Sequence, residues 1–388
     1  MPLLTFSQAA RLAGVDESVI RRHVERGELA ATREPDGGQR IDALELARLY
    51  PGPAVTEGQD QPLQMQRFTP LPVPLGGTGA APTAQGICVF APTPLFTVFV
   101  ENEQGREPEI HFHAGGQGVW VARMATGLGV PTTLCAPFGG EAGRIVRMLI
   151  EAEAITVQAV DCRGPTGAYV HDRRDGRRWS SADMPSGTLD RHELDDLYDA
   201  ALVSALQAGV AVLTGPAHPI LPPDTYRRLA LDLGRHGVGV VADLSAGPLA
   251  AALAAGVQFL KVSEQELTHG GYAAGNSVGQ LAQALRRLRQ TVPNILVSRI
   301  EAPALALIDR QFFMVEAPRF EPRDEHGGGD SMAAALAVGL ATGMPVEAML
   351  RLAAAAGALN LTRHGLGTGQ RRHIESLAGR VVLRPVEP

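Results

Sequence analysis

Residues 325–336 read EHGGGDSMAAAL and hold the clearest clue to the architecture of this chain. Three consecutive glycines lead into Asp330, and a run of small residues that we expect to be helical follows. Because glycine has no Cβ, backbone amides in such a loop can approach an anion closely, and a helix N-terminus favours negative charge. The stretch is either a flexible loop with Asp330 as its N-cap or an anion cradle beside a general base. In the second interpretation the cradle consists of Gly327, Gly328 and Gly329.

The bulk composition indicates a globular protein of more than one domain. The chain has 388 residues, which is enough for two or three domains with sizeable cores. Hydrophobic residues make up 45% and charged residues 20%, and both values are ordinary for a soluble protein. The sequence has no apolar run long enough to span a bilayer and no signal-peptide pattern, so we expect a cytoplasmic protein that does not enter a membrane.

Charge and cysteine content narrow the function classes. The formal net charge of −6 excludes a protein that coats nucleic acid as a polycation, so any DNA contact must come from a local patch. Three scattered cysteines are too few for a disulfide framework or a zinc site, and we expect no metal site built from side chains alone. Lys261 is the only lysine among 35 Lys and Arg residues. Either its compact ammonium has a role that arginine cannot fill, or it was retained by chance.

Residues 1–50 are expected to form a small separate domain. Ser7 is a candidate N-cap of a first helix, Gly14 makes the turn, and Asp16 is a candidate N-cap of a second helix. The segment ELAATREPDGGQRI predicts two short strands around an Asp-Gly-Gly turn, and a third helix is expected after Asp42. Two helices joined by a tight turn and followed by a β-hairpin predict a winged helix-turn-helix.

This N-terminal stretch resembles the DNA-binding domains of the MerR and excisionase group. The resemblance rests on the second helix and on the segments Gly14-Val15, Gly27-Glu28-Leu29 and Gln39-Arg40-Ile41. It implies that DNA is a partner and that the second helix enters the major groove. The residues that it places near bases or phosphates are Ser18, Arg21, Arg22, Arg33 and Arg40. The alternatives are that the arginines form the solvated face of a surface helix, or that the domain is a protein–protein adaptor.

The remainder of the chain divides into a linker and a large domain. Residues 51–85 contain seven prolines and no sustained periodicity, which predicts a semi-extended linker. Residues 86–388 alternate apolar strands with amphipathic helices and predict an α/β domain with a mostly parallel, doubly wound sheet. In such sheets, ligands bind at the carboxyl ends of the strands.

The large domain resembles the PfkB, or ribokinase-like, family of carbohydrate kinases, in the branch of phosphofructokinases and tagatose-phosphate kinases. Five ordered motifs carry the resemblance: AGGQGVWVARMATGLG (114–129), FGGEAGRIVRMLIEAEAIT (138–156), VADLSAGPLAAAL (241–253), FLKVSEQEL (259–267) and GGGDSMAAALAVGL (327–340). The resemblance implies a ribokinase-like sheet with a small β lid. It also implies that Gly327, Gly328 and Gly329 hold the transferring phosphoryl group, and that Asp330 accepts the proton of the attacking sugar hydroxyl.

Two further groups of site residues follow from the same resemblance. The substrate side comprises Gly115, Gly116, Gln117, Trp120 and Thr97. The nucleotide and Mg²⁺ side comprises Lys261, Ser263, Glu266, Ser298, Asp243 and Ser245. The cofactors implied for an active enzyme are ATP and Mg²⁺.

Several positions depart from the family pattern. Thr97 occupies the place of a substrate-binding Asp near the end of the first strand, Gln117 that of a Lys, and Trp120 that of a sugar-binding Asn. On the nucleotide side, Ile300 and Pro303 replace two glycines. Residues around the expected lid could supply replacement phosphate contacts, and these are His111, His113, Arg173, Arg174, Arg177 and Arg178.

Three functions fit this combination. The favoured hypothesis is a DNA-binding transcriptional regulator whose degenerate PfkB-like domain senses a phosphosugar or a nucleotide, because the departures fall on both sides of the site. The alternative is an active ATP-dependent phosphosugar kinase, similar to 1-phosphofructokinases, with Asp330 as general base and an accessory DNA-binding domain. The third is a dimer scaffold with neither ligand nor activity. We expect a homodimer with the lid, at residues 97–113 and 166–184, as its interface.

Overall fold

A computed structural model describes two compact units, Met1–Arg67 and Phe68–Pro388. The residues described are 3–13, 15, 17–26, 29, 31–33, 39–42, 86–102, 107–175, 178–215, 220–324, 326–363 and 365–388. The expected linker over residues 51–85 and the expected third helix after Asp42 lie outside them. The boundaries of the N-terminal domain and of the kinase-like domain therefore stay predictions.

The first unit contains the two helices and the two hairpin strands expected from the sequence. The helices are α1 (Phe6–Ala13) and α2 (Glu17–Glu25), and the strands are β1 (Leu3–Leu4), β2 (Ala31–Arg33) and β3 (Gln39–Asp42). The strands form an antiparallel sheet in the order β1-β3-β2. Its small core consists of Phe6, Ala9, Ala10, Ile20, Leu29 and Ile41. The assignment of a complete winged helix-turn-helix stays a prediction.

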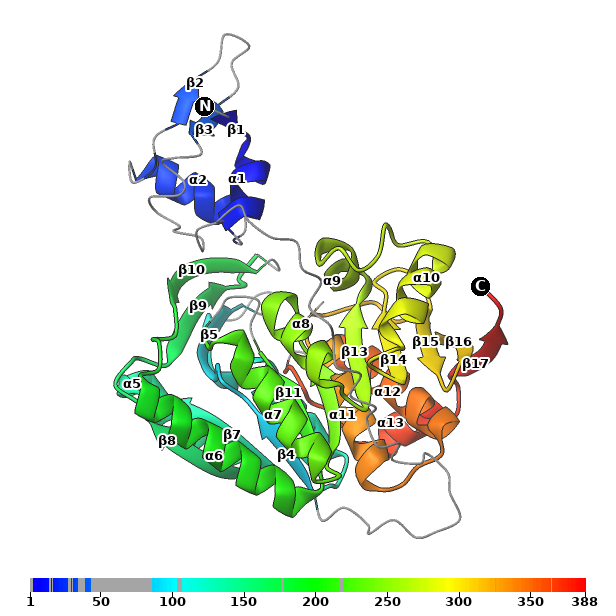
Figure 1. Cartoon of the computed structure of the whole chain (residues 1–388). Helices are drawn as coiled ribbons and strands as arrows, with labels where there is room; N and C mark the ends of the chain where they lie inside the picture. The colour runs from blue at the N-terminus through cyan, green and yellow to red at the C-terminus, as the bar shows by residue number, and fades with distance from the viewer. Residues whose placement is uncertain are drawn as a thin grey trace. The chain divides into compact units, whose positions relative to one another are not determined.

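A ten-stranded sheet forms the centre of the second unit, in the order β17-β16-β15-β14-β13-β12-β11-β4-β7-β8 (Figure 1). Its strands are β4 (Ile87–Phe90), β7 (Thr132–Phe138), β8 (Thr156–Asp161), β11 (Val210–Thr214), β12 (Gly239–Asp243), β13 (Phe259–Ser263), β14 (Asn294–Ser298), β15 (Ala304–Ile308), β16 (Gln311–Glu316) and β17 (Val382–Val386). All pairings from β8 across to β14 are parallel, and those from β14 to β17 are antiparallel. The mostly parallel sheet predicted from the sequence is confirmed.

Helices cover both faces of this sheet. One face packs against α4 (Gln117–Gly127), α5 (Gly140–Glu151), α11 (Gly328–Ala341), α12 (Val346–Leu361) and α13 (Arg371–Ala378). The other packs against α6 (Arg191–Ala208), α7 (Pro223–Arg235), α8 (Ala246–Ala255), α9 (Glu264–His269) and α10 (Val278–Leu288). Successive residues of β4 alternate between the two cores, with Ile87 and Val89 on one side and Cys88 and Phe90 on the other. The sheet is therefore doubly wound.

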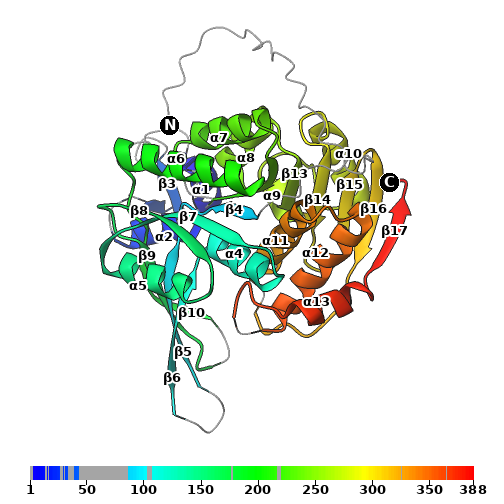
Figure 2. The same ribbon diagram turned by 90° about the horizontal axis from the view of Figure 1, so that it is seen from below.

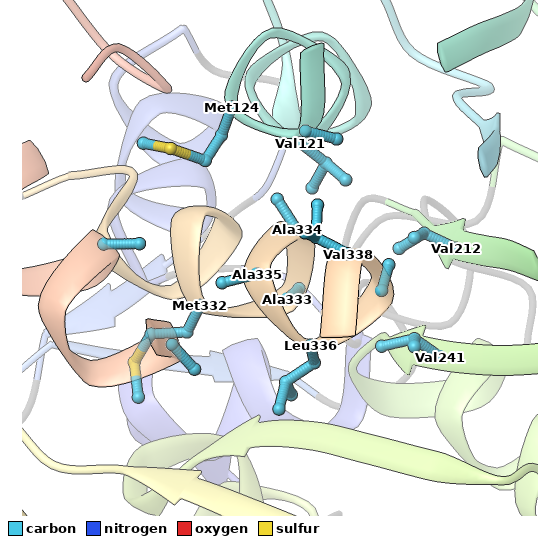
Figure 3. Packing of buried hydrophobic residues seen from close by; sticks show 14 of the residues in the cluster. Val121, Met124, Val212, Val241, Met332, Ala333, Ala334, Ala335, Leu336 and Val338 are labelled. Carbon is cyan, nitrogen blue, oxygen red and sulfur yellow. The ribbon is translucent and has the colours of Figure 1, made fainter. Parts of the chain in front are cut away.

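The helix α11 is held in the middle of one core by its small side chains. Residues Met332 through Val338 are all buried, and Figure 3 shows Ala334 directed toward Val121 of α4. A Cβ on Gly339 would come within 2.6 Å of Met349 Cγ on α12, so a larger residue would push these helices apart. The helix that follows the glycine loop is thus a rigid support.

A separate four-stranded sheet forms the lid, in the order β10-β9-β5-β6. Its strands are β5 (Leu95–Glu101), β6 (Glu109–Gly115), β9 (Gly167–Asp172) and β10 (Trp179–Met184). Figure 2 shows β5 and β6 projecting from the α/β body. The small β lid expected from the family resemblance is confirmed. Thr97, which the family resemblance placed near the end of the first strand, lies in the lid strand β5. Within the described residues, the protein has no helix that is both long and apolar enough to cross a membrane.

Candidate active site

Four charged side chains gather at the carboxyl edge of the parallel strands. Asp243 ends β12, and Lys261 pairs with it in register on the neighbouring strand β13. Lys261 Nζ donates to Asp243 Oδ1 at 3.1 Å, and both side chains are more than nine-tenths buried. Glu266 on α9 and Asp330 on α11 interact electrostatically with the same ammonium group. The fold therefore brings together four residues that the sequence singled out in three separate motifs.

The glycine loop lies directly against this group. Gly327 has a φ of 73°, in the left-handed region that favours glycine, and α11 begins at the next residue. A Cβ on Gly329 would come within 2.2 Å of Lys261 Nζ, so glycine leaves the room that the ammonium occupies. The first amides of a helix have no partner within that helix. An anion at this loop would meet these amides, the positive end of the helix dipole and a lysine.

The charges around Asp330 give its carboxyl group the pKa of a suitable proton acceptor. Burial and the negative charge of Asp243 raise the pKa of Asp330 to about 7, although Lys261 acts in the opposite direction. Burial alone would lower the pKa of Lys261, but Asp243, Glu266 and Asp330 together hold it above the usual value. Lys261 is therefore charged at neutral pH, and Asp330 changes its protonation state near neutral pH.

Other residues predicted for the site are hydrogen-bonded to the protein itself. Ser263 and Glu266 form a capping box at the start of α9: Ser263 Oγ accepts from Glu266 N at 3.1 Å, and Ser263 N donates to Glu266 Oε2 at 2.7 Å. Gln117 Nε2 donates to Asp243 O, and Gly215 N donates to Gln117 Oε1, both at 3.1 Å. The amide of Gln117 therefore ties together the ends of β11 and β12.

A cavity of about 830 Å³ adjoins the glycine loop, and its size is typical of a small-molecule site. Its lining includes Gly327, Gly328, Gly329, Ser263, Ser298, Ile300 and Pro303. The residues that replace the two family glycines therefore line an open cavity. Arg299 Nε donates to Glu264 Oε2 at 3.1 Å, and this ion pair holds the segment after β14 against α9. Ser245 is the N-cap residue of α8 and lines neither this cavity nor the next.

A second cavity, of about 310 Å³, lies at the lid. Its lining includes Thr97, Gly115, Trp120, His113, Arg123 and Arg178. Thr97 Oγ1 and Arg178 Nη1 are buried and have no hydrogen-bond partner among the residues that the structure describes. Buried polar atoms are usually paired, so these two atoms are available to hydrogen-bond a polar ligand in the cavity. The position before α4 requires glycine, because a Cβ on Gly116 would come within 2.4 Å of Thr93 O.

The sequence analysis identified some of the residues that line the lid cavity and missed others. Arg178 and His113 were proposed as replacement phosphate contacts, and both line the cavity. Arg123 and Glu153 were not singled out: Arg123 Nη2 donates to Glu153 Oε1 at 2.6 Å and to Ala114 O at 2.9 Å. One arginine and one glutamate thirty residues apart carry no local signal of a shared site.

The residues proposed for DNA contact lie in the first unit. Arg21 and Arg22 are exposed on α2, and Arg21 Nε donates to Glu17 Oε1 at 3.2 Å. Arg40 lies on β3. Ser18 and Arg33 belong to α2 and β2, but their side chains lie outside the description.

The comparison with known families identifies the large domain. Residues 86–372 match the model of the pfkB family carbohydrate kinases, well over half of the chain. This protein belongs to the pfkB family of carbohydrate kinases.

Two of the relatives are named as phosphofructokinases. The chain is 27% identical over 264 residues to ATP-dependent 6-phosphofructokinase isozyme 2 of Escherichia coli, a match that covers 66% of this chain and 83% of that protein. It is 24% identical over 278 residues to 1-phosphofructokinase of Vibrio cholerae, covering 71% and 87%. The solved tetrameric inhibited form of Escherichia coli phosphofructokinase-2 has a TM-score of 0.66 and 21% identity, covering 76% and 99%.

These findings correct the function that the sequence analysis favoured. A DNA-binding regulator with a degenerate sensing domain is wrong, because the matching relatives are named as kinases and none of the findings indicates DNA binding. The alternative of an active kinase is better supported. The error came from counting replaced motif residues, whereas the structure keeps the base, the ammonium group and the glycine loop together.

Replacing Lys261 with Met should reduce the free energy of unfolding by about 3–5 kcal/mol, because Asp243 would remain buried without its partner. Urea unfolding at pH 7 measures the change. Arg147→Met is the control, since it removes an exposed ion pair with Glu151 that should contribute less than about 1 kcal/mol. An equal loss of unfolding free energy in the two variants would contradict the prediction that the buried ion pair contributes more to stability than the exposed one.

The raised pKa of Asp330 makes a second prediction about stability. A carboxyl group that stays neutral in the folded state up to about pH 7 stabilises the fold fully below about pH 4, and this contribution is lost as pH rises toward 7. The wild type should lose this stability on going from pH 4 to pH 8, whereas Asp330→Asn has no such carboxyl group to ionise. The free energy of unfolding of Asp330→Asn relative to the wild type should therefore rise by about 3–4 kcal/mol from pH 4 to pH 8. Urea midpoints across this range measure the difference. A constant difference would show that Asp330 ionises normally.

Proposed function

We propose that this chain is an ATP-dependent phosphosugar kinase. The observation that carries the proposal is the placement of Asp330, Lys261 and the loop Gly327, Gly328 and Gly329 at one end of α11. A general base, a fixed cation and exposed amides are the groups that phosphoryl transfer to a hydroxyl requires. The names of the relatives support the same reaction class.

Each of these groups has a defined part in the transfer. Asp330 accepts the proton of the acceptor hydroxyl while the hydroxyl oxygen forms its bond to the γ-phosphorus of ATP. The bond from that phosphorus to the bridging oxygen breaks, and ADP leaves with the electron pair. Lys261 and the loop amides neutralise the negative charge on the transferred group.

The two cavities fit the two substrates of such a reaction. The larger cavity contains the glycine loop and has room for the nucleotide. Across the described residues no cluster of three or more His, Cys, Asp and Glu side chains could hold a metal. When bound, Mg²⁺ would neutralise phosphate charge during the transfer.

The lid cavity fits an anionic acceptor. Arg178 and Arg123 contribute guanidinium groups to its wall, and only the charge of Arg123 is balanced within the lining, by Glu153. The unpaired Arg178 Nη1 can donate to a phosphate, and the unpaired Thr97 Oγ1 can bond to a sugar hydroxyl. A phosphorylated sugar satisfies both atoms. Trp120 supplies an apolar wall where the family has a sugar-binding amide.

Asp330→Asn should lower kcat by about 10²- to 10⁴-fold, because the amide cannot accept the proton. The change keeps the size of the side chain, so KM for both substrates should change little. ADP release measured with fructose 1-phosphate, fructose 6-phosphate and tagatose 6-phosphate tests this, with the exposed Asp224→Asn as control. A wild-type enzyme that turns over none of these phosphosugars would reject the proposed function, and a fully active Asp330→Asn would reject the base.

We also propose that the lid mediates a homodimer. The lid face opposite Thr97 and Phe99 is apolar, and Ile110 and Phe112 on β6 are 60% and 58% exposed. Phe96 stacks on Phe112 with ring centroids 5.8 Å apart, which extends this face onto β5. An exposed apolar face of this kind is typical of an association surface. The tetrameric form of the Escherichia coli relative supports self-association within the family.

Phe112→Asp should convert the dimer into a monomer, because it places a charge in the middle of the apolar lid face. Light scattering coupled to size-exclusion chromatography measures the mass. Val203→Asp is the matched control, since Val203 is 53% exposed on α6, away from the lid. A wild-type monomer, or dimers in both variants, would contradict the proposed interface.

For the first unit we propose a winged helix-turn-helix fold. The consecutive helices α1 and α2, the antiparallel pairing of β2 with β3 and the shared core of Ile20 and Ile41 support it.

A further inference from the structure

The lid and the glycine loop are joined by a buried ion pair that the proposed chemistry does not use. Arg173 directly follows the lid strand β9, and its backbone N donates to Val100 O on β5 at 2.8 Å. Its Nη2 forms an ion pair with Asp324 Oδ2, and the two side chains are 12% and 2% exposed. The partners are 151 residues apart in the chain. The contact therefore connects the lid sheet to the segment that leads into the loop.

The arginine is held firmly on the lid side. Its guanidinium lies 4.2 Å from the ring centroid of Phe99, and its Nη1 is 3.5 Å from Glu101 Oε1. Phe99 lines the lid cavity. Arg173 is thus packed between β5 and β9, so a shift of these strands would carry the guanidinium with them.

Asp324 is held equally firmly on the loop side. Its Oδ1 accepts from His326 N at 3.0 Å and lies 2.8 Å from His326 Nδ1. His326 immediately precedes Gly327, and its carbonyl accepts from Asn360 Nδ2 at 2.8 Å. One carboxylate therefore contacts the lid with one oxygen and sets the entry into the phosphate loop with the other.

The acceptor cavity adjoins the same junction. Asp324 acts on the charge of Arg178, whose unpaired Nη1 is on the wall of that cavity. His171 on β9 bonds to Arg178 Nη2 at 3.2 Å and senses the charges of Arg173 and His326. An anion that binds Arg178 would change the balance of charge at Asp324, because the charges of Arg178 and Asp324 interact electrostatically.

We propose that Arg173 and Asp324 form a latch through which the position of the lid sets the geometry of the glycine loop. The proposal rests on the kinase function proposed above and concerns regulation of the same site. Both are positioning residues, since neither lines the larger cavity nor reaches the base. A closed lid keeps the loop amides aligned, and a lid displaced by loss of the acceptor releases Asp324 and the loop entry. The latch thereby ties productive loop geometry to a filled acceptor cavity.

The test compares Arg173→Ala, Asp324→Asn and their combination in the full-length protein. Asp324→Asn keeps an oxygen for the His326 amide and leaves Glu101 near Arg173, so this variant should fold. Arg173→Lys is the conservative variant, because an ammonium can bond Asp324 but cannot span Asp324 and Glu101 together. Arg371→Ala is the control, since its ion pair with Glu375 is exposed on α13.

Two readouts separate positioning from simple structural support. Steady-state kinetics should show kcat reduced about 10- to 100-fold in Arg173→Ala and Asp324→Asn, with KM for ATP within about threefold, partial rescue in Arg173→Lys and no further loss in the double variant. Hydrogen exchange should rise both in β9 and at the start of α11, with α7 unchanged as a measure of global stability.

The outcomes decide the proposal independently of the kinase assignment. Faster exchange in β9 alone, with kcat unchanged or with additive losses in the double variant, would overturn the latch. Faster exchange of α7 in Arg173→Ala would mean that this variant is globally destabilised. In that case, exchange of β9 and of the start of α11 in Arg173→Lys and Asp324→Asn decides whether the latch exists. A wild-type protein that transfers no phosphoryl group would defeat the proposed function, while the exchange of α11 would still show whether the lid controls the loop.

Discussion

Burying a charged side chain costs free energy unless it is paired with an opposite charge. In this protein Lys261 and Asp243 are buried as an ion pair near the ends of two central strands. Their hydrogen bond fixes the ammonium against Gly329, where any side chain would collide with it. Glycine at this position in the first turn of α11 leaves room for the ammonium. The buried pair therefore lies directly beside the proposed anion cradle and interacts with Asp330, the proposed base.

The same group of charges explains why the pKa of Asp330, the proposed base, lies near neutral pH. One ammonium faces the carboxylates of Asp243, Glu266 and Asp330, so the last of these to ionise does so against existing negative charge and in the absence of water. A base that is neutral part of the time near pH 7 also repels an anionic substrate less than a permanent carboxylate would. The cation that remains charged throughout is Lys261, the only lysine in the chain.

Motif losses in the sequence did not translate into loss of the site. The family lysine position holds Gln117, whose amide hydrogen-bonds to the ends of β11 and β12. The lid cavity, which we propose as the acceptor site, is lined instead by the polar groups of Thr97 and Arg178. Ile300 and Pro303, which replace the two family glycines, line the larger cavity. The regulator hypothesis failed because it compared residues position by position, whereas a site needs a chemical group in a place, whichever strand supplies it.

The sequence by itself determined the doubly wound sheet and the pairing of a glycine loop with Asp330, because apolar periodicity and glycine runs are local signals. The lid was expected only from the family resemblance. Two kinds of information came only from the tertiary structure. It showed which distant charges meet, as in Lys261 with Asp243, Arg123 with Glu153 and Arg173 with Asp324. It also showed that burial moves the pKa of Asp330. Such pairs depend on strand order and on the packing of a separate lid, and no pattern within one segment encodes which other segment will lie beside it.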